Sequence, residues 1–403
     1  MFRRVAGSAA LVLAASAALA ACGGSESSGE SDGGASASTD PIVIGAYGPL
    51  TGPAASLKVL YDAIGAYYDD LNAKGGIDGH PVTFVTEDDQ LNPAQTPAAA
   101  RTLVERDKVS MICGPAGSPT TVAVKPYLEA HDIGIVPAAG SDELIGKTSF
   151  LQVPTYTPLA ADLVKYAVED LHATKIAIAY TDDSVGQPTL AGATGELEEL
   201  GLEPVATVSF NGTAPDQSAL VAKLKQSGAD FVVVNNTAPV ISQVFKAAAK
   251  IGYEPTWGAA WPALTKTLFD LSGGALDSGN IVFSSPFLLG DAPEAKDFQD
   301  VLTKYAPDVD QTDTIAMLGW TSASVCTEVL RRAVEAADGG VPTSKEIVAA
   351  MPGTTVDNGY VNGLSWSADQ HSGQRQARII GVKDGQFVAL TDLRELPDVA
   401  AGK

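Results

Sequence analysis

The sequence is poor in the residues on which metal sites and redox chemistry depend. Its 403 residues include three cysteines and four histidines. The histidines, His80, His131, His172 and His371, lie singly, without the spacing of metal ligands. No cysteine has a neighbouring histidine that would activate a thiol. We therefore expect no metal, no other cofactor and no cysteine nucleophile.

Common catalytic motifs are also missing. Gly45-Ala46-Tyr47-Gly48 is not followed by the Gly-Lys-Ser/Thr of a phosphate-binding loop. No serine stands in a Gly-x-Ser-x-Gly elbow, which disfavours an extracellular hydrolase. The neighbouring acids Asp182-Asp183 and Glu87-Asp88-Asp89 are most simply solvated or helix-capping carboxylates. The sequence therefore predicts that this protein is not an enzyme.

Basic residues are scarce relative to acidic ones. Lysine and arginine total 26 against 48 aspartates and glutamates, which gives a formal charge of −22 at pH 7. Removing Arg3 and Arg4 with a cleaved N-terminus would lower the charge by two, to −24. So acidic a chain is unsuited to nucleic acid and to lying flat on anionic lipid.

The N-terminus carries a short apolar run. Arg3 and Arg4 precede Val5–Leu19, a run of small and apolar residues that is too short for a membrane span and is typical of a secretory signal. Leu19-Ala20-Ala21-Cys22-Gly23 resembles the bacterial lipobox, in which the cysteine thiol carries lipid. We expect residues 1–21 to be a signal peptide and Cys22 to anchor the chain to the outer face of the cell membrane.

Residues 22–41 lack large apolar side chains almost entirely and predict a lipidated flexible tether. About 355 residues remain from Ile42 onward, which is too long for one ordinary core and favours two lobes. Cys113 and Cys326 either form a disulfide, worth on the order of 4–5 kcal/mol for so long a loop, or are separately buried thiols.

Short β-rich runs alternate with amphipathic segments of helical length along the chain. One series extends over residues 42–137 and a second over residues 159–259. A further strand at Ile281–Ser284, three helical segments up to Met351 and a β-rich tail follow. Strand and helix in regular alternation predict an α/β fold with two doubly wound parallel sheets. In the tail, Lys383–Gln386 predicts a hairpin turn.

Several segments in order and spacing resemble the branched-chain amino-acid-binding proteins of ATP-driven (ABC) importers. They are Ile44–Gly52, Leu71–Gly79, Glu87–Asp89 with Asn92–Gln95, Gly114–Ser118, Val136–Ala139, Tyr180–Ser184 with Gly186-Gln187, Asp216–Val221 and Gly228–Val232. Each is weak alone, but together they extend in order from residue 44 to residue 232.

The resemblance implies a type I periplasmic-binding-protein fold with three crossover strands, near Val153–Thr157, Ser284–Phe287 and Pro352–Asp357. Lobe 1 would then comprise residues 42–154 and 286–352, and lobe 2 residues 155–285 and 353–395. A small molecule would bind between the lobes, at the carboxyl ends of the strands. The chain would act as a monomer and deliver its ligand to ABC permease subunits.

In lobe 1 the resemblance implies that Ser118 and the loop after the next strand contact the ligand. Ser118-Pro119 is a typical helix start, so its hydroxyl would either cap that helix or hold a ligand carboxylate. Family members use a backbone carbonyl and a threonine in the next loop. Ala138 can supply the carbonyl, but Gly140 replaces the threonine, with Ser141 beside it as a substitute hydroxyl.

Lobe 2 departs further from the family pattern. Val185 stands where amino-acid binders have a tyrosine, Thr237 replaces another, and Trp261 follows the strand where an acid would receive the ligand's ammonium. A buried ammonium without a carboxylate costs several kcal/mol, so the pattern favours a ligand without a charged amine. Trp261 would be either a flat wall for the ligand or a core residue.

Three further candidates are Tyr47, Leu57 and Tyr156; Leu57 replaces a cleft tyrosine of the family. The sequence thus predicts an extracytoplasmic solute-binding lipoprotein that captures an amino acid or a related carboxylate or amide and delivers it to an ABC import permease. The alternative is a sensor ectodomain of the same fold that reports its ligand to a signalling partner.

Overall fold

The structure is a computed structural model that describes residues 40–399. The expected signal peptide, the lipidation site Cys22 and the expected tether up to residue 39 lie outside the described residues. Within residues 40–399, none of the helices combines the length and apolar character that a bilayer crossing requires.

Strands and helices alternate along most of the described chain, as the sequence predicts. The strands are β1 (Ile42–Gly48), β2 (Val82–Asp88), β3 (Met111–Ala116), β4 (Gly134–Ala138), β5 (Ile176–Thr181), β6 (Ala206–Phe210), β7 (Phe231–Val234), β8 (Thr256–Ala260), β9 (Ile281–Ser285), β10 (Thr355–Val356), β11 (Leu364–Ser365), β12 (Gln376–Lys383), β13 (Gln386–Ala389) and β14 (Arg394–Glu395). The helices are α1 (Val59–Ala73), α2 (Thr96–Arg101), α3 (Ser118–Ala130), α4 (Tyr156–Glu169), α5 (Gly186–Glu199), α6 (Ser218–Ser227), α7 (Ala238–Lys250), α8 (Lys266–Ser272), α9 (Lys296–Tyr305), α10 (Thr314–Ala336) and α11 (Ser344–Ala350). Short helical turns are η1 (Ala55–Lys58), η2 (Thr102–Arg106), η3 (Asp142–Leu144), η4 (Trp261–Ala263) and η5 (Pro293–Ala295).

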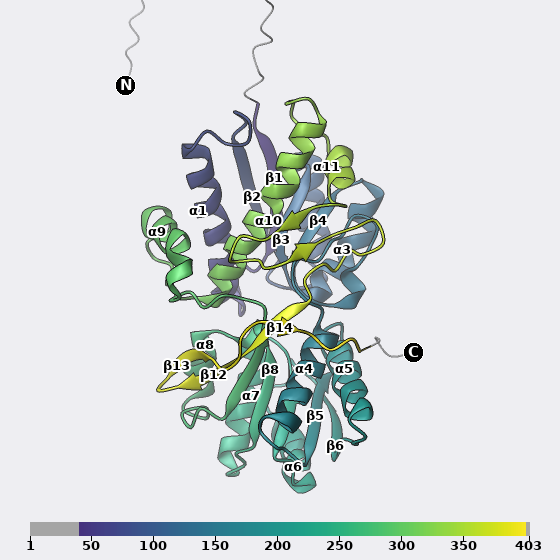
Figure 1. Cartoon of the computed structure of the whole chain (residues 1–403), viewed down its shortest axis with the longest axis vertical. Coiled ribbons are helices and arrows are strands. Elements are labelled where there is room, and N and C mark those ends of the chain that lie inside the picture. Colours follow the sequence, from purple (N-terminus) through teal and green to yellow (C-terminus); the bar gives the residue numbers. More distant parts are fainter. Residues whose placement is uncertain (1–39, 400–403) are drawn as a thin grey trace, which may run out of the picture. The chain divides into compact units, whose positions relative to one another are not determined.

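The first sheet has the strand order β2-β1-β3-β4, and all its pairings are parallel. Successive residues of β3 point to opposite faces: Cys113 packs among α1 and α10, whereas Ile112 packs towards α3. Helices therefore cover both faces of this sheet, and Figure 1 shows it between α1, α10, α11 and α3. Apolar side chains on both faces explain why β1, β3 and β4 are mostly apolar and buried, whereas the edge strand β2 is more polar.

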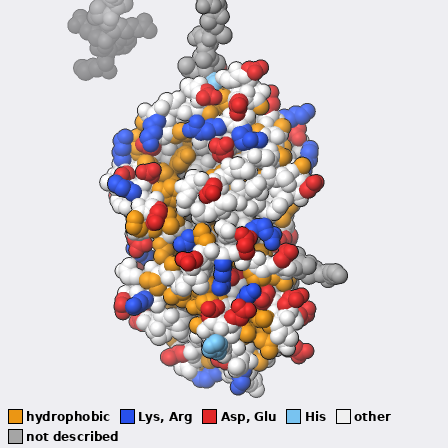
Figure 2. Space-filling model, viewed as in Figure 1, with side chains coloured by type: hydrophobic (Ala, Val, Ile, Leu, Met, Phe, Trp, Pro, Cys, Tyr) orange, Lys and Arg blue, Asp and Glu red, His pale blue; other side chains and the backbone are white. Residues whose placement is uncertain are grey.

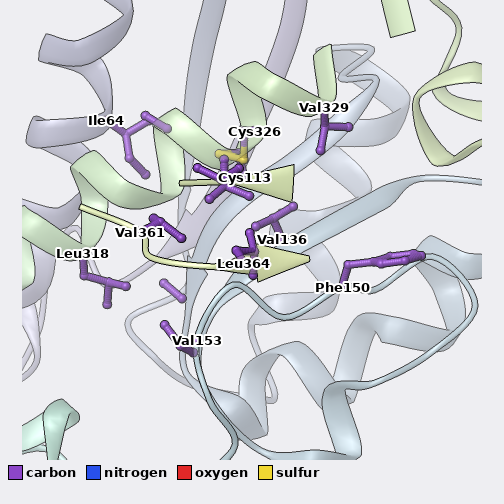
Figure 3. Close-up of a cluster of buried hydrophobic side chains, with 14 of the residues drawn as sticks. Ile64, Cys113, Val136, Phe150, Val153, Leu318, Cys326, Val329, Val361 and Leu364 are labelled. Carbon is purple, nitrogen blue, oxygen red and sulfur yellow. A yellow bond between two sulfur atoms is a disulfide. The ribbon is translucent and has the colours of Figure 1, made fainter. Parts of the chain in front are cut away.

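Cys113 and Cys326 form a disulfide across the core of this lobe. Their sulfur atoms are 2.10 Å apart and their Cα atoms 6.2 Å apart, and 213 residues separate them in sequence. Figure 3 shows the bond between α10 and the sheet, surrounded by apolar side chains such as Ile64, Val136 and Val329. Closing so long a loop contributes about 5 kcal/mol in the chain-entropy description.

The second sheet has the order β13-β12-β9-β8-β7-β5-β6, and β14 pairs with β12. The five strands from β6 to β9 are parallel, while β12 runs antiparallel to both β9 and β13. In β7, Phe231 and Val233 face α4 and α5, whereas Val232 and Val234 face α6 and α7. The predicted α/β fold class, with two doubly wound sheets, is confirmed.

The hairpin between β12 and β13 has the turn that its sequence indicates. Lys383 pairs with Gln386, which leaves Asp384 and Gly385 as the two turn residues. Their φ angles are +51° and +72°, a conformation that suits an Asp-Gly pair and matches the twist of two hairpin strands.

Residues beyond the expected third crossing pack with the first sheet. Val356, Leu364 and Trp366 pack in the same core as the first sheet, and the Trp366 indole donates a hydrogen bond to the carbonyl of Leu151 over 2.8 Å. The chain joins the second sheet only at Gln376. The lobe boundaries, with the third crossing near Pro352–Asp357, remain a prediction, and the Trp366–Leu151 contact lies beyond that expected crossing.

Charges are scattered over the face that Figure 2 shows. Basic and acidic side chains intermingle there, with apolar patches between them. Most ion pairs of the described residues are exposed, as between Lys296 and Asp300, and each such pair contributes little to stability.

Candidate ligand-binding site

A cavity of about 340 Å³ lies at the carboxyl ends of strands from both sheets. The elements of the first sheet and its helices contribute Leu57, Leu60, Leu91, Pro93, Ala116, Gly117, Ser118, Pro119, Thr120, Ala138, Ala139, Ile315 and Leu318. The segments of the second sheet contribute Tyr156, Asp183, Val185, Asn211, Gly212, Thr213, Asn236, Thr237, Val240, Trp261 and Pro262. Its volume falls at the lower end of the roughly 300–1,000 Å³ that is typical of small-molecule sites.

The start of α3 forms one wall of this cavity. Its N-cap is Gly117, with φ +88°, and not Ser118 as the sequence suggests. A side chain at Gly117 would approach Thr120 Oγ1 to 2.6 Å, so glycine lets the chain turn tightly into the helix. Ser118 is the first helical residue, and its hydroxyl makes no capping hydrogen bond. The alternative that Ser118 caps its own helix is therefore wrong.

The Ser118 hydroxyl is buried and not engaged in a hydrogen bond of normal geometry. The residue is 1% exposed, and the hydroxyl has no such partner among the described residues. Tyr156 lines the cavity beside it. Burial raises the pKa of the Tyr156 phenol, and the backbone of Gly140 and the Ser118 hydroxyl oppose that rise. The two side chains therefore form one polar corner that donates hydrogen bonds at neutral pH.

Trp261, in the turn η4 directly after β8, forms another part of the wall. The side chain of Asn235 fixes the end of this strand, because its Oδ1 accepts a hydrogen bond from the N–H of Ala260 over 3.2 Å. The indole ring packs against Tyr156 and Phe287, with ring centroids 6.1 Å and 5.6 Å away. Trp261 is 4% exposed, yet its Nε1 has no hydrogen-bond partner among the described residues. Buried polar atoms are normally paired, so this donor is available to a ligand.

Two helices of the second sheet begin at the cavity and differ in their charge. At α5, Asp183 Oδ1 accepts hydrogen bonds from the N–H groups of Val185 and Gly186, both 2.9 Å long, and from Thr181 Oγ1. This carboxylate neutralises the partial positive charge of that helix start. At α7, Thr237 is the N-cap without a side-chain capping bond, and no carboxylate is placed there among the cavity residues.

The cavity has few charged groups. Asp183 is the one acid, and no lysine, arginine or histidine occurs, among the described residues that line it. No group of three or more potential metal ligands occurs within residues 40–399. The arrangement suits binding of a small molecule by hydrogen bonds and apolar contacts, with partial charges from helix starts.

Five of the eight ligand residues predicted from the sequence lie together at this cavity. They are Leu57, Ser118, Ala138, Thr237 and Trp261. Tyr156, a further candidate, lies there as well.

Gly140 and Ser141 do not line the cavity, in contrast to the prediction for the loop after β4. The Gly140 carbonyl accepts a hydrogen bond from the N–H of Tyr156 over 2.7 Å, and a side chain at Gly140 would approach the carbonyl of Pro154 to 2.7 Å. The Ser141 hydroxyl caps η3 by accepting from the N–H of Glu143. Both residues position the first crossing segment and do not face the ligand space.

Tyr47 also lies away from the cavity. Its side chain is fully buried on the α3 face of the first sheet, among Leu103, Val109 and Ile135. Burial raises the pKa of its phenol, and the neighbouring Thr121 hydroxyl opposes that rise. Strand alternation turns this side chain to the face of the sheet opposite α1, which explains why Tyr47 does not line the cavity.

Sequence reasoning missed the cavity residues that α10 supplies. Ile315 and Leu318 lie one turn apart on this helix and reach the cavity from almost 200 residues beyond Ser118. Nothing local marks them, because an apolar residue at helical spacing looks the same whether it packs in a core or lines a site.

Comparisons with known proteins agree with this geometry. A family model described as periplasmic binding protein matches residues 41–386. The chain is 29% identical over 241 residues to an amino acid binding protein of Pseudomonas aeruginosa, and the match covers 58% of this chain and 64% of that protein. It is 25% identical over 333 residues to the Leu/Ile/Val/Thr-binding protein of Salmonella typhimurium, covering 81% and 87% of the two chains.

Among solved structures, the fold is similar to that of a branched chain amino acid ABC transporter protein from Thermus thermophilus with bound valine. The TM-score is 0.78 at 23% identity, and the match covers 88% of this chain and 96% of that chain. The two-sheet architecture is thus a fold shared with that protein. The chain belongs to the periplasmic binding protein family.

Proposed function

We propose that this protein captures a small extracytoplasmic solute, an amino acid or a related carboxylate or amide, and delivers it to an ABC import permease. The family membership supports ligand capture as its activity. The relatives named above support transport, since the one from Thermus thermophilus is a branched chain amino acid ABC transporter protein with bound valine. The mature chain would be lipid-anchored through Cys22 and monomeric.

One observation supports capture most directly: residues from both sheets' segments line one cavity and carry buried polar atoms without a hydrogen-bond partner of normal geometry. Ser118 Oγ comes from the start of α3 and Trp261 Nε1 from the end of β8. A ligand that bridges such groups contacts both lobes only when they are close, and it therefore stabilises the closed arrangement. A closed receptor then presents a permease with a surface that the open form lacks.

Contacts at the edge of the cavity support such a closed arrangement. Thr314 Oγ1, at the start of α10, donates a hydrogen bond to the carbonyl of Leu264, which follows η4. Lys266 forms an ion pair with Asp310 over 2.9 Å beside it. Both pairs join residues around the start of α10 to residues that follow η4.

Binding and delivery are tested separately. Isothermal titration of the purified chain with aliphatic amino acids, carboxylates and amides should give at least one dissociation constant in the micromolar range, which corresponds to about 8 kcal/mol. Small-angle scattering should report a smaller radius of gyration with that ligand. Binding of none of these compounds would contradict capture.

Uptake distinguishes transport from the sensor alternative. Deleting the gene in its host should abolish accumulation of the radiolabelled ligand, and a plasmid copy should restore it. Unchanged uptake, with a lost transcriptional response to the ligand, would favour a sensor. A Cys22→Ala variant should lose incorporation of an alkyne-labelled fatty acid and leave the cell membrane fraction, if Cys22 carries the anchor.

A further inference from the structure

We propose that the cavity is selective for a monocarboxylate with an apolar tail and no ammonium group. This inference rests on the proposed function, because it names the ligand class of the same cavity. Three features of the cavity carry it: the groups that can donate hydrogen bonds, the apolar wall and a single lining acid that already accepts hydrogen bonds at the start of α5.

The donors gather at one end of the cavity. Ser118, Tyr156 and Trp261 all line the cavity, the Ser118 hydroxyl neighbours the Tyr156 phenol, and the Tyr156 and Trp261 ring centroids are 6.1 Å apart. The indole N–H can only donate, so it has nothing to offer an ammonium group. A carboxylate has two oxygens and can accept from Ser118 on one side and from Trp261 on the other.

The start of α3 adds partial positive charge at this end. Its cap, Gly117, offers no side-chain oxygen, and α3 has 13 residues with no acid in its first turn. Its first N–H groups and dipole therefore remain available to an anion. The buried and unpaired Ser118 hydroxyl at the same place is an independent sign that a polar group of a ligand belongs there.

Apolar side chains form much of the remaining lining. They belong to Leu57, Leu60, Leu91, Val240, Ile315 and Leu318. A tail of about the size of a leucine side chain or a phenyl ring buries its apolar surface against this wall.

The one acid among the described lining residues already serves as a hydrogen-bond acceptor at a helix start. It is Asp183, whose Oδ1 accepts three hydrogen bonds at the start of α5. On the side of the second sheet, the start of α7 has no side-chain cap, and its partial positive charge repels a cation. A buried cation without a carboxylate partner is strongly unfavourable.

The test compares three ligands that share one carbon skeleton. 4-Methylpentanoate is L-leucine without its ammonium group, and 4-methylpentanamide lacks the charge altogether. Titration calorimetry of the purified chain should show the acid binding at least tenfold more tightly than either of the others. If 4-methylpentanamide binds as tightly as the acid, or if none of the three binds, the inference is wrong.

Variants locate the carboxylate. Ser118→Ala and Trp261→Phe should each weaken 4-methylpentanoate binding at least tenfold, because each removes a donor to a charged group. Matched controls are Ser149→Ala, a buried unpaired hydroxyl outside the cavity, and Trp320→Phe, an indole in another cluster. The controls should leave affinity unchanged, and melting curves show which variants are folded. If the site variants bind 4-methylpentanoate as tightly as the controls do, the placement of its carboxylate at Ser118 and Trp261 is wrong.

If L-leucine binds more tightly than 4-methylpentanoate, the inferred ligand class fails while the proposed function can still hold. Tighter binding of L-leucine that is lost on Asp183→Asn would show that Asp183 holds an ammonium, which overturns the ligand class but leaves solute capture intact. If the ligand class is right, Thr237→Asp, which adds a carboxylate at the start of α7, should weaken the acid and strengthen L-leucine.

Discussion

Each of the two lobes is built from chain segments that are far apart in sequence, but the lobes fasten these segments differently. In the first lobe, the Cys113–Cys326 disulfide holds α10 to β3 across 213 residues. In the second, Arg394 of β14 forms an ion pair with Asp162 of α4, 2.8 Å long and 232 residues apart in sequence. A covalent bond acts mainly by restricting the unfolded chain, whereas a buried ion pair must offset the desolvation of its own charges.

The pKa of Asp162 reflects the cost of desolvating this ion pair. Asp162 is 1% exposed, and burial raises the pKa of its carboxyl, while Arg394 and the Ser284 hydroxyl oppose the rise. Ser284 Oγ donates to Asp162 Oδ2 over 2.7 Å. The second lobe therefore depends on a complete set of partners for this carboxylate.

The largest effect is expected from removing the disulfide. A Cys113→Ala/Cys326→Ala variant should lose about 5 kcal/mol of unfolding free energy, because 213 residues are released from one loop. Urea unfolding of the double variant, compared with that of the disulfide-bonded parent, measures the loss. Hydrogen exchange should rise in α10 and β3 and stay unchanged in β7. Equal loss of protection in both lobes would contradict separate fastening.

Removing the ion pair should have the next largest effect. Arg394→Gln should cost about 3 kcal/mol, at the low end for removing one partner of a buried pair because Arg394 is partly exposed. Without Arg394, the already raised pKa of Asp162 rises further. As pH falls, the folded variant can then take up a proton on Asp162, which relieves the cost of burying its charge. The loss should thus be greater at pH 8 than at pH 5. Arg375→Gln, whose pair with Asp398 is exposed, is the matched control.

Gly140→Ala probes how the first crossing positions the site. The added methyl would approach the carbonyl of Pro154 and, at 3.0 Å, the ring of Tyr156. We expect a shift of the crossing and about tenfold weaker 4-methylpentanoate binding, although Gly140 does not line the cavity. Calorimetric titration checks the loss. The same substitution at Gly65, where a methyl would meet no atom within 4 Å, should change nothing. Unchanged affinity in Gly140→Ala would remove Gly140 from a positioning role.

His80 provides a smaller, pH-dependent fastening within the first lobe. Its Nδ1 and Nε2 lie 2.9 Å and 3.0 Å from the carbonyls of Asp40 and Gly339, so only the protonated ring donates to both. These carbonyls, with the nearby carboxyls of Asp40 and Asp78, raise the pKa of His80.

A group whose pKa is raised on folding stabilises the fold below its unfolded pKa and loses that effect as pH rises. His80→Gln should therefore cost about 1 kcal/mol at pH 5.5 and less at pH 8.5. Urea unfolding at the two pH values measures the difference. A larger cost at pH 8.5 would mean that the neutral ring carries the contacts. His172→Gln, at an exposed position, is the control.

The fold could be predicted from sequence because its signals are local. Short apolar runs between segments of helical length mark strands such as Phe231–Val234, and the Asp384-Gly385 turn marks a hairpin. The third crossing could not be placed, because Val356, Leu364 and Trp366 are apolar whichever lobe they pack in. Ser118 and Trp261 could be predicted because they directly follow strand ends. Ile315 and Leu318 could not, since only the tertiary fold brings α10 to the cavity.

A crystal structure of the chain grown with 4-methylpentanoate tests the central claim most directly. We predict the carboxylate between Ser118 Oγ and Trp261 Nε1, within 3.2 Å or so of each as in ordinary hydrogen bonds, with the tail against Leu57 and Ile315. A ligand bound outside this cavity, or a cavity filled by the protein's own side chains in its presence, would contradict the claim that the solute joins the two lobes.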